Sequence, residues 1–103
     1  MSQYHANIKL RTLIEQAQHY QQQLTMFLSQ DSHDRARVQA LSRNIHLLTQ
    51  KVDRFPVKTS ADIQLKLSFY AEQLGYVRQN AMRLGAITEK IKQLYANYQS
   101  LVD

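Results

Sequence analysis

Residues 6–28 read ANIKLRTLIEQAQHYQQQLTMFL, and this stretch decides the fold that we expect for the chain. Its apolar and weakly polar residues return at alternating steps of four and three, which is the period of a helix face that packs along a seam. The residues between them are mostly Gln, Lys, Arg and Glu, as on the solvent side of such a helix. The pattern predicts a helix over residues 4–29. The seam consists of Ala6, Leu10, Leu13, Ala17, Tyr20, Leu24 and Phe27.

A second helix with the same period is expected over residues 32–55. The polar segment SQDSHD, residues 29–34, separates it from the first, and Asp31 or Ser32 is the expected N-cap. Pro56 disfavours helix in the residue before it and therefore ends the second helix. Because the connection is short, the two helices are predicted to form an antiparallel hairpin. The second seam consists of Val38, Leu41, Ile45, Leu48, Val52 and Phe55.

The rest of the chain is also helical in pattern, but its seam slips by one position at Gly85. Two interpretations are open. A single helix over 60–101, kinked or continuous at Gly85, is favoured because a helix–helix turn usually needs more loop residues than surround this glycine. The alternative is a break at Gly85 and a fourth helix. The predicted fold is thus all-α and a single domain over 1–103: a helical hairpin packed on a long third helix, or a four-helix bundle, with coiled-coil-like seams.

Composition excludes several classes of protein. The chain has two glycines, one proline and no cysteine, so a β-rich fold, disulfides and thiolate chemistry are not expected. No stretch approaches the roughly 18 consecutive apolar residues of a membrane span, and the first ten residues lack the order of a signal peptide. We therefore expect a cytoplasmic protein. The net charge of +5 favours anionic partners.

No pattern in the sequence indicates catalysis. The four histidines stand 13 or 14 positions apart, whereas two histidines that bind one metal ion on a helix stand three or four apart. The acidic residues are scattered, and the glycine loops and nucleophile motifs of common enzymes are missing. The prediction is a protein with no enzymatic activity, no metal, no cofactor and no small-molecule substrate.

A third helix nearly twice as long as its neighbours would leave apolar side chains uncovered. A second copy of the chain is the simplest cover, because twofold dimers are the commonest oligomers. We therefore predict a non-enzymatic protein-interaction module, such as an adaptor, chaperone or assembly factor, that forms a homodimer or binds another protein. The expected contact residues are Leu65, Phe69, Tyr76, Ile87, Ile91, Leu94, Tyr95 and Tyr98.

The alternative function is a basic accessory protein that binds the phosphate backbone of nucleic acid, for example in DNA replication. Aromatic residues interleaved with Arg and Lys after residue 60 motivate it, together with the net charge. In size and helical character the chain resembles bacterial replication-accessory proteins and secretion or flagellar chaperones, and this resemblance assigns no role to any residue. The candidate anion contacts are Arg43, Lys51, Arg54, Lys58, Lys66, Arg78 and Arg83.

Overall fold

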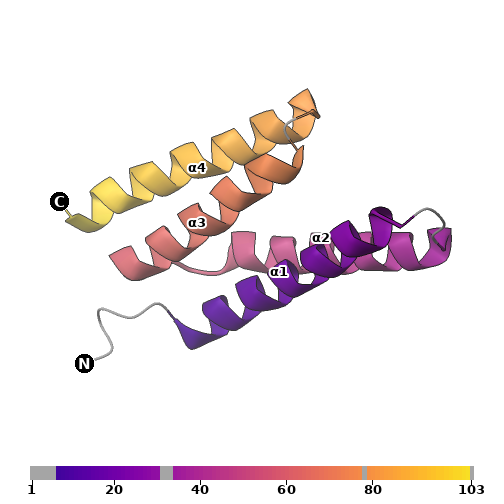
Figure 1. The fold of residues 1–103 in the computed structure, drawn as a ribbon. Coiled ribbons are helices and arrows are strands. Elements are labelled where there is room, and N and C mark those ends of the chain that lie inside the picture. Colours follow the sequence, from indigo (N-terminus) through magenta and orange to yellow (C-terminus); the bar gives the residue numbers. More distant parts are fainter. Residues whose placement is uncertain (1–6, 31–33, 78, 103) are drawn as a thin grey trace. The chain divides into compact units, whose positions relative to one another are not determined.

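A computed structural model describes residues 7–30, 34–77 and 79–102, with the side chains up to residue 99. These residues form four helices: α1 (Ile8–Leu28), α2 (Arg35–Arg54), α3 (Ser60–Val77) and α4 (Ala81–Val102) (Figure 1). The all-α prediction is confirmed. The chain divides into two compact units, each a pair of packed helices. The single domain expected over 1–103 stays a prediction.

One unit, Ile8–Phe55, is a helical hairpin in which α1 packs against α2. Each helix buries residues at helical spacing, as the two seams predict. At the closed end, the guanidinium of Arg37 lies 5.7 Å from the centre of the Phe27 ring, a cation–π contact between the two helices. The antiparallel hairpin is therefore present as expected. The buried apolar residues are Leu10, Ile14, Ala17, Leu41, Leu48 and Val52.

The ends of α2 follow from capping chemistry. Asp34 is its N-cap, and the carboxylate of Asp34 accepts a 2.9 Å hydrogen bond from the amide of Ala36. The expected caps, Asp31 and Ser32, lie outside the described residues, and the helix begins a turn later than predicted. At the other end Phe55 has extended backbone dihedrals, as the residue before Pro56 should.

The second unit contains Asn7 and the chain from Pro56 onward, and in it α3 packs against α4. The ammonium of Lys90 on α4 lies 5.6 Å from the centre of the Tyr70 ring on α3, which adds a cation–π contact to this packing. The buried apolar residues of the two helices are Ile63, Phe69, Tyr70, Ile87 and Leu94.

The favoured single helix over 60–101 is wrong, because α3 ends at Val77 and α4 begins at Ala81. Asn80 is the reason for the new start: its side-chain oxygen accepts a 3.1 Å hydrogen bond from the amide of Arg83, and its carbonyl accepts one from Leu84. The alternative break at Gly85 is also misplaced, since Gly85 lies inside α4 with ordinary helical dihedrals. The fourth helix therefore starts a full turn before the glycine.

The start of α3 is fixed by a capping box. The hydroxyl oxygen of Thr59 accepts a hydrogen bond from the amide of Asp62, and the carboxylate of Asp62 accepts one in return from the amide of Thr59. The amides of Lys58 and Asn7 also donate to this carboxylate. Burial raises the pKa of Asp62, but these amides outweigh it, so the pKa lies below its ordinary value. Asp62 is thus a buried, ionised structural residue.

Candidate functional site

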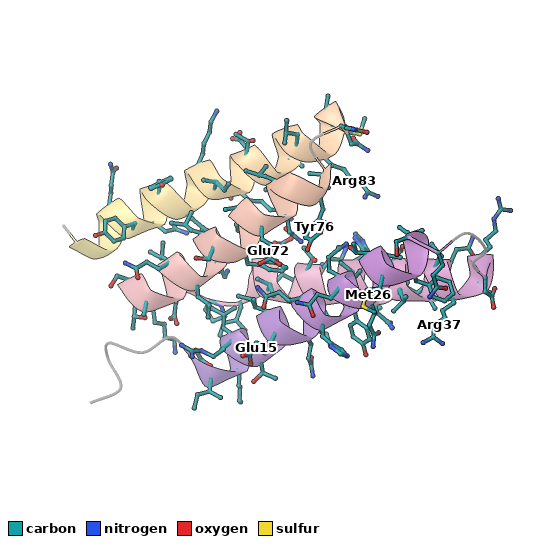
Figure 2. The ribbon with its side chains drawn as sticks, viewed as in Figure 1. Glu15, Met26, Arg37, Glu72, Tyr76 and Arg83 are labelled. Carbon is teal, nitrogen blue, oxygen red and sulfur yellow. The ribbon has the colours of Figure 1, made fainter. Side chains whose placement is uncertain are left out.

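The eight predicted contact residues separate into a buried and an accessible group. Phe69, Ile87 and Leu94 are buried within the chain, where they contribute to packing. Leu65 and Ile91 are half-buried. Tyr76, Tyr95 and Tyr98 are exposed, and Figure 2 shows Tyr76 on α3, one turn beyond Glu72. The accessible part of the predicted surface therefore consists mainly of tyrosines.

Three of these residues lie together on α4. Ile91, Tyr95 and Tyr98 follow at steps of four and three, which places them along one side of the helix, and we refer to them as the α4 tyrosine edge. The exposed fraction is 57% for Tyr95 and 38% for Tyr98. Tyrosine presents a large apolar ring and a polar hydroxyl on a side chain with little rotamer freedom to lose, which suits it to a contact surface.

The two helices of this unit differ in length. The α4 helix has 22 residues and α3 has 18, and both meet at the same turn. At 1.5 Å per residue, the four additional residues extend the free end of α4 by about 6 Å. Figure 1 shows the end of α4 reaching past the start of α3. Tyr98 lies toward this end, but it is less exposed than Tyr95, so the difference in length does not account for the exposure of the edge. The three side chains of the edge carry no charge.

The predicted anion contacts are distributed over both units. Arg43, Lys51 and Arg54 are exposed on α2, and Lys58 is exposed in the segment before α3. Arg83 is exposed in the first turn of α4 (Figure 2). In contrast, Lys66 is buried on α3, one turn after Asp62 and on the same face. Arg78 lies outside the described residues.

Three of these cations share the solvent-facing side of α2. At 3.6 residues per turn, Arg43, Lys51 and Arg54 fall within an arc of about 80°, and we refer to them as the α2 basic stripe. Leu47 lies between them on the same side, with 48% of its surface exposed. The helix carries five basic side chains and one acidic, Asp53, which is half-buried and lies outside this arc.

Over 7–30, 34–77 and 79–102, no three His, Cys, Asp or Glu side chains come close enough together to hold a metal ion. The rings of His19 and His46 each lie within hydrogen-bonding distance of a glutamine one turn later, Gln23 and Gln50 respectively, on exposed surfaces. None of the described helices combines the length and the apolar character needed to cross a membrane.

Two features of the structure were not predicted from the sequence. Leu47 was assigned to no surface, although plotting α2 at 100° per residue places it among the cations. The hydrogen bond between Asn7 and Asp62 had no sequence signal, because it joins residues 55 positions apart. Local patterns indicate caps and faces, whereas a contact of this range depends on the tertiary fold.

Comparisons with known proteins add no functional information. No protein-family model matches the chain. No curated protein and no solved structure shows significant similarity to it either. Any assignment of function therefore rests on the residues and surfaces of the chain itself.

Proposed function

We propose that this chain is a non-enzymatic helical interaction module that pairs with a second copy of itself through the α4 tyrosine edge. The observation that carries the proposal is the joint exposure of Tyr95 and Tyr98 beside the half-buried Ile91. Tyrosine is enriched at the centres of protein interfaces, and it is frequent among the residues that dominate binding energy. A partner that covers these rings removes apolar area from water, which favours association.

A second copy is the partner that suits the charge of this edge. In a twofold dimer the same patch must be complementary to itself, and a charged group near the twofold axis approaches its own copy, which has equal sign. An edge made of Ile91, Tyr95 and Tyr98 avoids that repulsion, because none of the three is charged at neutral pH. Paired rings can also adopt offset or edge-to-face contacts, worth about 0.5–1.5 kcal/mol each beyond the area that they bury.

The non-enzymatic part of the proposal rests on the sequence. Its histidines and carboxylates stand at spacings that suit surface and capping roles, and the chain has no cysteine. The one strongly buried carboxylate among the described residues, Asp62, is engaged by the backbone amides at the start of α3. Its role there is accounted for by capping.

The test is the mass of the chain in light scattering for the wild type and for a Tyr95→Gln/Tyr98→Gln variant. Both substitutions lie on exposed positions of a helix, and glutamine has good helix propensity, so the variant should fold. We expect the wild type to sediment and scatter as a dimer and this variant as a monomer.

The matched control is Met26→Gln/Met82→Gln, which removes two exposed apolar side chains outside the edge. Figure 2 shows Met26 on α1, and Met82 lies in the first turn of α4. The control should keep the mass of the wild type. Equal masses for the wild type and the tyrosine variant, or monomers in the control alone, would count against the tyrosine edge as the contact.

A further inference from the structure

A second surface, on the other unit, carries a separate inference. The outer side of α2 follows the positions Ala36, Ala40, Arg43, Leu47, Lys51 and Arg54, which are spaced by three or four residues and are all exposed. All charged groups in this line are cations, and the only acid of the helix, Asp53, lies on another side. We propose that the α2 basic stripe binds the phosphodiester backbone of nucleic acid.

The dimensions of the stripe fit a phosphate backbone. From Arg43 to Arg54 the helix rises about 17 Å, which corresponds to about five nucleotides along one strand of a duplex at 3.4 Å per nucleotide. A straight helix that presents cations along one line can follow such a row of phosphates. Two of the three cations are arginines, whose planar guanidinium can donate two parallel hydrogen bonds to one phosphate.

The small side chains at the start of the line support a close approach. Ala36 and Ala40 project little beyond the backbone of α2, so a polymer lying along the helix meets no bulky obstacle before it reaches Arg43. The exposed polar side chains of Gln39 and Asn44 flank the line and can donate hydrogen bonds to phosphate or sugar oxygens. Such contacts position a protein on a backbone without reading the base sequence.

Two other anionic partners fit the stripe less well. Helices that lie on lipid bilayers bury a broad face of Leu, Phe or Trp, whereas Leu47 is the only bulky apolar residue of this line. Protein interfaces are usually centred on apolar and aromatic anchors, and arginine is enriched there whereas lysine is depleted. The line that contains the α2 basic stripe has no aromatic residue and only one bulky apolar residue, Leu47. Three cations around one leucine therefore favour a row of phosphates over an acidic protein surface.

The experiment is a fluorescence anisotropy titration of the full chain with a labelled 20-base-pair duplex and with one of its strands, at several salt concentrations. Three phosphate contacts predict a slope of log K against log salt of about −2.7 for the duplex and about −2.1 for the single strand. Between 50 and 200 mM salt, binding to the duplex should weaken by about 40-fold. A measured slope near the value predicted for the duplex or for the single strand shows that the corresponding form is bound through all three cations.

The decisive variant is Arg43→Gln/Lys51→Gln/Arg54→Gln, and the matched control is Arg11→Gln/Arg83→Gln/Lys92→Gln. Both remove three exposed cations and leave the same net charge, but only the first alters the stripe. The stripe variant should lose most of its affinity and its slope, while the control keeps a slope near that of the wild type. Lys51 and Arg54 lie in the last turn of α2, where cations also stabilise the helix, so their loss could weaken α2 itself. The single variant Arg43→Gln, in the middle of the helix, avoids this effect. It should lower the magnitude of the slope by about 0.9.

Three results would overturn the proposal. The first is no binding of either oligonucleotide at 50 mM salt. The second is an equal loss of affinity in the stripe variant and its control, which would assign binding to overall charge. The third is competition by polyglutamate, or by vesicles of anionic lipid, that is as effective as competition by unlabelled DNA at equal charge. None of these three results would bear on the proposed dimer, because the α4 tyrosine edge contains none of the substituted residues.

Discussion

The backbone amide of Asn7 donates a 2.8 Å hydrogen bond to Oδ1 of Asp62, which lies 55 positions further along the chain. The other oxygen, Oδ2, accepts hydrogen bonds from the amides of Lys58 and Thr59, at 3.1 and 3.3 Å. One carboxylate, only 3% exposed, thus satisfies three backbone donors. Asp62 thus links Asn7, the residue before α1, to the first turn of α3 and holds the backbone at the start of α3 in place.

Replacing Asp62 with asparagine should therefore lower stability. Asparagine has nearly the same shape but no charge, and its NH2 group cannot accept the hydrogen bonds that one carboxylate oxygen accepts now. We expect a loss of roughly 1–3 kcal/mol in the free energy of unfolding, measured by urea denaturation. The control is Asp34→Asn, because asparagine is as good an N-cap as aspartate and Asp34 is exposed. Similar losses in both variants would contradict a special role for Asp62.

The same carboxylate predicts a dependence of stability on pH. In the folded protein the pKa of Asp62 lies below its ordinary value of 3.8, because the amide hydrogen bonds favour the ionised form more than burial disfavours it. Its stabilisation is therefore complete above the pKa of the unfolded chain and is lost as the pH falls through the folded pKa. The difference in unfolding free energy between the wild type and Asp62→Asn should shrink as the pH is lowered from about 5 to about 2. A difference that stays constant or grows in acid is the opposite result.

Asn80 should be needed for the start of α4. Substitution by alanine removes the side-chain oxygen that accepts from Arg83, at an expected cost of about 1 kcal/mol. Substitution by serine or aspartate should restore most of that loss, because both are good N-caps. Denaturation of the three variants measures this. If alanine were as stable as asparagine, residues 60–102 would behave as one continuous helix, in which alanine is favourable.

The two halves of the fold could not be predicted equally well. Over the first hairpin, the apolar period, the polar segment 29–34 and Pro56 all agree, and the helices lie within a few residues of their predicted bounds. After residue 60 the apolar seam continues through Val77, Ala81 and Leu84 at helical steps even though the helix stops. The spacing of apolar residues alone therefore cannot reveal this turn. The sequence feature that marks the turn is Asn80, because asparagine is a preferred N-cap. The prediction placed the possible break at Gly85 instead.

Gly85 provides a test of where that break lies. Gly75 and Gly85 both lie in helices with φ in the ordinary range, and a methyl group at either would meet no atom within 4 Å. Alanine should therefore stabilise the protein by about 0.5–1 kcal/mol at each position, because glycine loses more backbone entropy in a helix. Thermal or urea denaturation of Gly85→Ala and Gly75→Ala measures the change. Destabilisation by Gly85→Ala alone would indicate a strained turn at that glycine.

The candidate surfaces could be predicted only in part. Helical spacing identifies residues that share a side of a helix, so the grouping of Tyr95 with Tyr98, and of Lys51 with Arg54, follows from the sequence. Spacing does not tell which side faces the neighbouring helix. Leu94 and Lys66 were both candidates for external contacts, yet both are buried. Their burial depends on which helix faces pack together, and that cannot be read from the spacing of residues within one helix.

The mass of the wild-type chain as a function of concentration, measured by sedimentation equilibrium, tests the proposed self-association most directly. One chain has a mass of 12.1 kDa. We predict a mass that rises with concentration toward twice this value and then levels off, as expected for a closed twofold dimer. A mass that stays at 12.1 kDa over the whole range would contradict the pairing of two α4 tyrosine edges.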